Sequence, residues 1–388
     1  MIVTRRSFLG WGTTLSAGAT VSFANLVGCA GRCNGDDEPD VSELVPDPGG
    51  ILDLPEGFTY RIVQEKGDRM SDGKRARGRP DGMAAFAGPD GTTILMRNHE
   101  LLVGAGGVSR VVLDEQYDVV SSNDVLNGTT RNCAGGPSPW GWLSCEETPR
   151  GGVWVCPIDL SEAMARDERV RIDGYGSFKH EAVAVDPGSL VAYLTEDDGD
   201  AHFFRFVPAS LATPFEGQLQ AMTVDGTPRF RTDAMTPGDA IEVAWVDVAP
   251  DEARATAESA GAAVVRRGEG VWWFDGTVYF TATSNGQVFE LVPIDGDRGR
   301  LTLLTDAVNK PDNITVGPDG TLYVAEDNGC ANFVRRIDPD GTVRPFAYNR
   351  LKPEDEFAGV CFSPRGDVMF VNLQGSGLTL IIEGPFPT

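Results

Sequence analysis

Residues 311–328 read "PDNITVGPDGTLYVAEDN": a short apolar strand, a Pro-Asp-Gly turn and a second apolar strand, with polar residues at both ends. Glycine at such a turn tolerates the positive φ that a tight hairpin needs. Five other segments follow the same plan, at residues 80–100, 132–147, 180–198, 268–285 and 356–374. Their turn glycines recur roughly every 44 to 50 residues, with one interval about twice as long, which is typical of propeller blades. We therefore predict an all-β fold, a six-bladed β-propeller.

The ends of the repeat region indicate how the ring closes. After the last repeat only "GLTLIIEGPF", residues 377–386, remains, which suffices for a third strand but not a fourth. The strand-like "GFTYRIV", residues 57–63, is expected to supply the missing strand. The long interval contains an insertion around 208–265, and residues 250–263 have the composition of a surface helix or a lid.

Composition agrees with this class of fold. The chain has 388 residues with 47 Gly, 25 Pro and 41% hydrophobic residues, too much turn chemistry for a helical bundle. Its formal net charge is −24, spread along the chain, which disfavours binding to nucleic acid or to an anionic membrane. The carboxylates either solvate the surface or converge on metal ions.

The beginning of the chain resembles an export signal. Arg5 and Arg6 precede an uncharged run from Trp11 to Val27, the pattern of a twin-arginine signal. The run ends at "LVGC", which resembles a lipobox and makes Cys29 a candidate for lipidation; cleavage without a lipid is the alternative. We expect a signal at 1–28, a flexible tether at 29–50, and one propeller domain at 51–388. The expected location is the periplasm or the cell envelope.

Polar residues concentrate where the first strand of each repeat begins and where the second strand ends. In a propeller blade these two positions share one rim, and Asp81 and Glu356 also stand at strand beginnings. Carboxylates gathered at one rim raise one another's pKa values unless cations neutralise them. The sequence therefore predicts bound metal, with the candidate ligands Asn98, Glu100, Cys145, Glu146, Glu147, Glu181, Asp197, Glu269, Asp312, Asn313, Glu326 and Asp327.

The types of ligand narrow the choice of metal. Oxygens of Asp, Glu and Asn suit calcium, whereas a thiolate does not, so Cys145 indicates an iron-class transition metal beside the calcium. With three histidines in the chain, a histidine-rich zinc or copper site is not expected, and structural hydrogen bonds are predicted for His99 and His180. For Cys133 we expect packing as a small apolar residue, with a disulfide as the alternative.

A set of motifs in this order resembles the PhoX-type alkaline phosphatases: "RNHE" at 97–100, "NCAGG" and "PWGWLSCEE" within 132–147, "KHEAVAVDP" at 179–187, "RRGEGVWW" at 266–273 and "EFAGVCFSPRGDVMFVNLQ" at 356–374. The similarity runs from about Gly57 to Phe386. It implies a six-bladed propeller, twin-arginine export, and a central cluster of iron and calcium. The implied reaction is hydrolysis of small phosphomonoesters.

The resemblance also implies roles for individual residues. Cys145 would be an iron-binding thiolate, Arg267 would contact phosphate, and Glu181 and Glu269 would be metal-binding carboxylates. Further calcium oxygens would come from Asn98, Glu100, Asp312 and Asn313. The chain departs from the family pattern in two ways: it is shorter than the best-known members, and it has Arg-Gly-Glu at 267–269 where Arg-Pro-Glu would be expected.

Two alternatives to the phosphatase remain open at this level. One is a calcium-only propeller hydrolase that resembles gluconolactonases, although such a site needs no thiolate. The other is a non-catalytic surface lipoprotein stabilised by calcium. In each case a monomer is expected, and a membrane contact is expected only through a lipid at Cys29.

Overall fold

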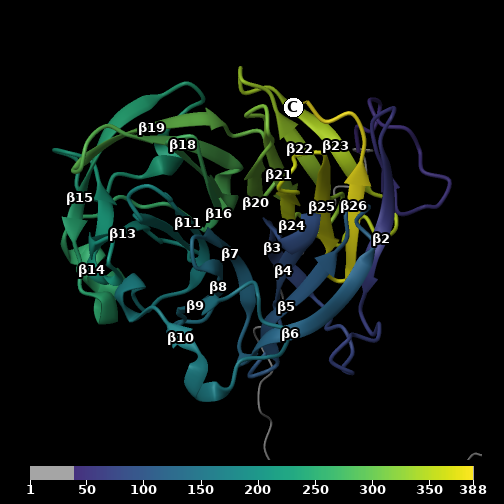
Figure 1. Cartoon of the computed structure of the whole chain (residues 1–388). Helices are drawn as coiled ribbons and strands as arrows, with labels where there is room; N and C mark the ends of the chain where they lie inside the picture. Colours follow the sequence, from purple (N-terminus) through teal and green to yellow (C-terminus); the bar gives the residue numbers. More distant parts are fainter. Residues whose placement is uncertain (1–38, 388) are drawn as a thin grey trace, which may run out of the picture.

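The computed structural model describes residues 39–387, which form an all-β, propeller-like fold with few helices (Figure 1). The strands form five hydrogen-bonded sheets. Two of these are four-stranded meanders that follow the chain directly. The first contains β3 (Pro80–Ala87), β4 (Thr93–His99), β5 (Gly106–Leu113) and β6 (Val119–Thr129). The second contains β7 (Asn132–Ser138), β8 (Gly141–Glu146), β9 (Val153–Cys156) and β10 (Val170–Arg171).

The third sheet has nine hydrogen-bonded strands. The strands therefore do not form the six separate blades that the sequence predicted. It begins with β11 (His180–Val185), β12 (Ala192–Glu196), β13 (Phe203–Ser210) and β14 (Thr213–Thr223). It ends with β16 (Gly268–Phe274), β17 (Thr277–Ala282), β18 (Gln287–Pro293) and β19 (Arg298–Thr305). The cause is β15 (Ala240–Asp247), which pairs with β14 on one side and β19 on the other and joins two four-stranded groups.

The last two sheets contain the two ends of the described chain. One contains β20 (Pro311–Val316), β21 (Leu322–Glu326), β22 (Phe333–Ile337), β23 (Val343–Asn349) and the short β1 (Leu52–Asp53). The other contains β24 (Phe357–Phe362), β25 (Val368–Leu373), β26 (Leu378–Glu383) and β2 (Thr59–Glu65). β2 pairs antiparallel with β26, so the prediction that residues 57–63 complete the final sheet is confirmed.

Six strands surround the centre of the molecule. β3 contacts β7, β7 contacts β11, and the circle continues through β16, β20 and β24 back to β3; their labels lie near the middle of Figure 1. Each of these strands has an irregularity in its register close to its beginning. Small residues allow the strands to approach there: a Cβ on Gly82 would lie 2.5 Å from Ala134 Cα. The bulges re-aim the residues that lie within them.

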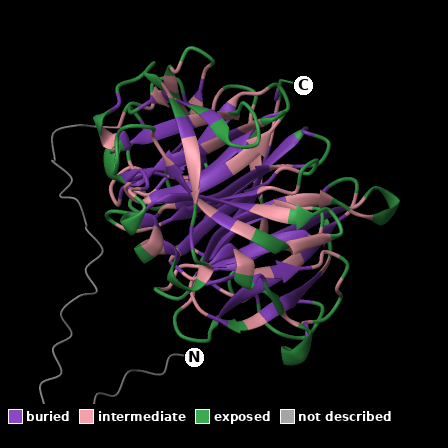
Figure 2. Cartoon of the chain, turned by 90° about the vertical axis from the view of Figure 1, so that its left-hand side faces the viewer, coloured by how far each residue is buried: buried purple, intermediate pink, exposed green. Residues whose placement is uncertain are grey.

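The apolar core lies between neighbouring sheets, with exposed residues mainly in the surrounding loops (Figure 2). On the strands that follow the turns, apolar residues face the adjacent sheet because successive side chains alternate. Trp272 of β16 packs against three separate hydrophobic clusters at the end of the channel opposite the strand beginnings. Trp142 is fully buried.

The insertion is partly helical, as predicted. Its helix α1 (Ala253–Ser259) follows β15 and the 3-10 turn Pro250–Glu252. The other 3-10 turns are Pro89–Gly91, Arg166–Glu168, Asp173–Tyr175, Thr232–Ala234 and Thr283–Asn285. In the described part of the chain, no helix has the length and apolar character needed to cross a membrane.

The described part of the predicted tether lies against the sheets. Leu44 is buried, Val45 forms a β-bridge with Leu54, and the hydroxyl of Tyr60 donates to Asp47. Ordered contacts therefore begin before residue 51. The predicted signal at 1–28 and the candidate lipidation site Cys29 lie outside the described residues, and the division of the chain into signal, tether and domain stays a prediction.

Candidate functional site

One backbone hydrogen bond recurs at the beginning of every central strand. The residue that follows the second strand of each hairpin donates its N–H to the carbonyl of the residue before the first strand. The six bonds are Glu100 to Arg79 (3.0 Å), Glu147 to Arg131 (2.9 Å), Asp197 to Lys179 (3.2 Å), Thr283 to Arg267 (2.9 Å), Asp327 to Lys310 (3.1 Å) and Gln374 to Glu356 (3.2 Å). Strand beginnings and strand ends therefore share one rim, as the sequence predicted.

This rim surrounds a cavity of about 580 Å³, within the usual range of ligand sites. The six donor residues of the recurring bond all line it. A deeper layer comes from the second residue of five central strands: Asp81, Cys133, Glu181, Glu269 and Asp312. The predicted site residues that the structure brings together here are Glu100, Glu147, Glu181, Asp197, Arg267, Glu269, Asp312 and Asp327.

Three carboxylates converge most closely. One oxygen each of Glu181, Glu269 and Asp312 lies within 4.8 Å of the others. They come from β11, β16 and β20, which are consecutive around the centre. Such spacing lets three carboxylates share one cation, and without a cation their charges repel one another.

The protonation of this cluster reflects that repulsion. Burial, followed by the charge of Asp327, raises the pKa of Asp312 to about 7. Burial and neighbouring carboxylates also raise the pKa values of Asp81, Glu181, Glu269 and Glu356 above their ordinary range. A cation in the cavity would favour the ionised forms and return these pKa values toward normal.

Basic residues stand above the carboxylates. Arg79, Arg131, Arg267 and Lys310 line the cavity, each directly before a central strand, and each has a left-handed backbone with φ between 48° and 53°. For a non-glycine residue this conformation costs roughly 1–2 kcal/mol, and it recurs at functional sites. Arg267 donates to Asp197 Oδ1 at 2.7 Å, and its Nη2 lies 3.1 Å from Glu269 Oε1. The cavity therefore offers cationic donors beside a cluster that can hold a metal ion.

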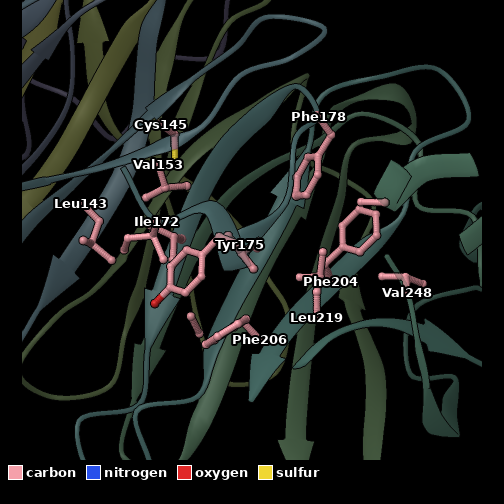
Figure 3. Close-up of a cluster of buried hydrophobic side chains, with 14 of the residues drawn as sticks. Leu143, Cys145, Val153, Ile172, Tyr175, Phe178, Phe204, Phe206, Leu219 and Val248 are labelled. Atoms are coloured by element: carbon pink, nitrogen blue, oxygen red, sulfur yellow. The ribbon is translucent and has the colours of Figure 1, made fainter. Parts of the chain in front are cut away.

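The two cysteines of β7 and β8 both pack in one hydrophobic cluster, as expected for Cys133, but they differ at the cavity. Cys133 lines the cavity, and its Sγ lies 3.5 Å from the carbonyl oxygen of Glu181. Cys145, the predicted iron ligand, is fully buried among Leu143, Val153 and Tyr175 (Figure 3) and does not line the cavity. The thiol in the cavity lining therefore belongs to Cys133, and the iron-binding role expected for Cys145 stays a prediction.

Strand alternation explains the position of Cys145. β8 ends at Glu146, so Cys145 stays on the side of the strand that Leu143 shares and packs against the next sheet. Glu147 lies beyond the strand end, where the chain bends to bond Arg131, and its side chain enters the cavity. Burial, followed by the charge of Asp197, raises the pKa of Glu147 to about 7.

Four other predicted ligands lie outside the cavity lining and form hydrogen bonds or an ion pair with neighbouring residues. Asn98 donates to the carbonyl of Cys133 at 2.7 Å and accepts from Trp142 Nε1 at 2.8 Å, so it ties two sheets together. Glu146 faces away from the cavity and accepts from Trp154 Nε1 at 2.8 Å. Glu326 is fully buried in an ion pair with Arg335 at 2.9 Å.

Asn313 lies below the cavity rather than in it. Its Oδ1 accepts the N–H of Gly359 at 3.0 Å, and its Nδ2 donates to Asp312 Oδ1 at 2.9 Å. It therefore orients Asp312 from below.

Several cavity residues were missed by the sequence argument. They are Arg79, Arg131, Cys133, Thr283, Lys310, Gly329, Glu354 and Gln374, together with Asp81 and Glu356, which were recognised at the rim but left out of the ligand set. Cys133 could have been found by position, because it is the second residue of its strand, as Asp81, Glu181, Glu269 and Asp312 are. The basic residues carry the same kind of signal, because each of the four that line the cavity stands directly before a central strand.

The two histidines named from the sequence have the predicted structural hydrogen bonds. His99 is buried between Gly78 O at 3.1 Å and Ser109 Oγ at 2.7 Å. His180 is bonded to Gly176 O at 3.1 Å. Burial lowers the pKa of both rings, which agrees with neutral structural imidazoles.

The fold and the cavity define a class: a propeller-like protein with a ring of carboxylates, one thiol and several arginines at the mouth of its central channel. A model of the family described as alkaline phosphatase PhoX matches residues 40–125, 104–153, 149–303 and 296–377. The chain belongs to the PhoX alkaline phosphatase family.

Solved structures agree at the level of fold. The chain is similar to PhoX from Pseudomonas fluorescens in complex with vanadate, a transition state analogue, with 17% identity, a TM-score of 0.72, and coverage of 86% of this chain and 96% of that chain. A gluconolactonase-type structure aligns with 12% identity and a TM-score of 0.50, over 87% and 95% of the two chains. The search of curated proteins finds no match by sequence.

Proposed function

We propose that the protein is an exported, metal-dependent phosphatase that hydrolyses small phosphomonoesters in the central cavity. The observation that carries this proposal is the convergence of Glu181, Glu269 and Asp312 on one point, with the thiol of Cys133 and the guanidinium of Arg267 in the same cavity. Membership of the PhoX family supports the reaction. The related Pseudomonas fluorescens protein, crystallised with vanadate, a transition state analogue, supports the choice of a phosphoryl substrate.

The donors present fit calcium and iron. Clustered carboxylate oxygens are the hard ligands that calcium prefers, and a thiolate suits an iron-class metal. A further oxygen is available because Gln374 Oε1 is buried and accepts no hydrogen bond from the described residues, while its Nε2 donates to Asp81. We infer that Glu181, Glu269 and Asp312, with Cys133 beside them, hold the metal ions.

The chain's own residues then bind and orient the substrate. Bound metal ions would act as Lewis acids toward the phosphoryl group. Arg267 would bind the phosphoryl oxygens as a fixed cation, and Arg79, Arg131 and Lys310 at the rim would attract an anionic ester into a protein of net charge −24. Below the cavity, small residues of the central strands pack closely against one another.

The proposal includes the architecture and the location of the protein. Six equivalent rim bonds and six central strands support a six-bladed propeller in which β15 joins the third and fourth blades. The paired Arg5 and Arg6 and the lipobox at Cys29 support twin-arginine export to the periplasm or cell envelope, with a lipid as the membrane contact.

The test is a hydrolysis assay on protein exported through its own signal. A phosphomonoester and a lactone are compared, before and after chelation, for the native protein and for Glu269→Gln. Glu216→Gln, an exposed change on the outer strand β14, is the control. We expect metal-dependent hydrolysis of the phosphomonoester, lost in Glu269→Gln and retained in the control.

Two results would contradict the proposal. Hydrolysis of the lactone alone, with calcium as the only metal, would favour the lactonase alternative. Bound calcium without hydrolysis of either compound would favour a binding protein.

A further inference from the structure

A second concave site lies outside the central cavity, at the outer edge of the β7–β10 sheet. It has a volume of about 600 Å³, enough for a small organic ligand. Its wall contains Arg166, Arg169, Arg171 and Trp154, and we refer to it as the arginine pocket. The two sites share no lining residue, and the consecutive Glu146 and Glu147 face one site each.

The arginines of this pocket are poorly neutralised. Within residues 39–387, Arg166 and Arg169 have no carboxylate partner and no side-chain hydrogen bond, and Arg169 Nε is buried without an acceptor. Arg171 Nε lies 3.6 Å from Asp173, whose side chain is 86% exposed, so this ion pair is weak. Positive charge concentrated in a pocket of a strongly acidic protein indicates an anionic ligand.

The local backbone makes room for these side chains. β10 pairs with β9, which places Arg171 directly opposite Trp154. A Cβ on Gly152 would lie 2.2 Å from Arg171 Nε, and one on Gly128 would lie 3.4 Å from Arg169 Nη1. The guanidinium groups therefore rest against two glycines, where larger residues would displace or crowd them.

The one carboxylate that lines the arginine pocket, Glu146, already accepts hydrogen bonds from other groups. Glu146 accepts the N–H of Thr130 at 2.9 Å and Trp154 Nε1 at 2.8 Å. It therefore orients the indole, which lines the pocket, and forms no ion pair with the arginines among the described residues. An arginine cluster beside an aromatic ring suits a phosphate group attached to a ring, because guanidinium groups bind phosphate oxygens in pairs and the indole offers a flat apolar face.

We propose that the arginine pocket is a second binding site, separate from the central cavity, for the phosphate group of a small molecule. The phosphate has two sources: free orthophosphate, or an intact organic phosphate whose ring packs on Trp154. Both would be held by Arg166 and Arg169, with Arg171 beside them.

The test is isothermal titration calorimetry of the metal-loaded protein with orthophosphate and with phenylphosphonate, whose carbon–phosphorus bond a phosphatase does not hydrolyse. The double variant Arg166→Gln, Arg169→Gln is compared with the native protein, and Arg300→Gln on β19 is the matched control. We expect one fewer binding site in the double variant, or at least about tenfold weaker binding at that site, with kcat/KM for a phosphomonoester unchanged. Arg300→Gln should behave as the native protein does.

The two probes distinguish the sources. Binding of orthophosphate at the arginine pocket identifies free phosphate, whereas binding of phenylphosphonate alone, weakened by Trp154→Leu, identifies an organic phosphate. Equal stoichiometry and affinity for both probes in the native protein and the double variant would overturn the proposal. Because the comparison uses the difference between these two proteins, it holds whether or not the central cavity is catalytic.

Discussion

Both cysteines of the β7–β8 hairpin pack in the hydrophobic cluster beside the central cavity, but of the two only Cys133 also lines the cavity. Cys133 of β7 enters a cavity of carboxylates and arginines, whereas Cys145 of β8 packs with Leu143, Val153 and Tyr175 (Figure 3). The two residues are chemically identical and close in sequence. Their different environments show that position within the repeat, rather than the neighbouring residues, assigns a side chain to the site.

The largest effect is expected for Phe204→Ala, which removes a side chain from the hydrophobic cluster. Phe204 is fully buried and stacks on Phe178 at 4.6 Å, so its removal should lower the free energy of unfolding by about 3–5 kcal/mol. Urea denaturation measures this change, and kcat/KM per folded molecule should stay at the native level. A loss of activity without a loss of stability would show that the cluster takes part in the site.

On the cavity side, Arg267→Ala should have nearly as large an effect, but on activity. Removing a fixed cation that binds the phosphoryl oxygens should lower kcat by about 10²–10³-fold while the protein stays folded. Steady-state kinetics with a phosphomonoester measures it, and Arg300→Ala is the control. Native activity in Arg267→Ala would move the phosphate-binding role to Arg79, Arg131 or Lys310.

Asn98→Ala sharpens the boundary between the two regions. Asn98 bonds the carbonyl of Cys133 and the indole of Trp142, so its loss leaves buried polar groups unpaired and should cost about 1–3 kcal/mol of stability. Metal content should be unchanged, because Asn98 does not line the cavity. Loss of calcium from this variant would support the prediction from the sequence that Asn98 is a calcium ligand.

The smallest expected effect is a pH dependence of the metal-free protein. The pKa of Asp312 and that of Glu147 are raised to about 7, so the folded protein binds more protons than the unfolded chain between about pH 4 and 7. Stability should therefore be highest below about pH 4 for these groups and fall as pH rises through 7. Thermal melts after chelation should show a lower Tm at pH 8 than at pH 6, and metal ions should remove this difference. A Tm that rises with pH in the metal-free protein would contradict the repulsion described here.

Much of the fold could be predicted because turns and strands with alternating side chains depend on residues that are close together in the sequence. The hairpin at 311–328 made the repeat recognisable in the sequence. The repeat in turn predicted the shared rim at which Glu100, Glu147 and Asp327 lie. The joining of two blades by β15 could not be predicted, since that pairing depends on where a long insertion returns to the sheet.

The errors in the site have equally specific causes. Cys145 was placed beside Glu147 by sequence proximity, although β8 ends between them and the chain changes direction. Arg131 and Lys310 were not considered, although each stands directly before a central strand, and their left-handed backbone is not encoded in any motif. Aligning the six repeats by the second residue of the central strand places Cys133 among the carboxylates.

The most direct test is elemental analysis of Cys133→Ala and Cys145→Ala, each exported with its native signal. We expect Cys133→Ala to lose iron, and Cys145→Ala to retain iron and calcium with, at most, a modest loss of stability. Iron lost from Cys145→Ala and retained in Cys133→Ala would contradict the assignment of the cavity thiol to Cys133.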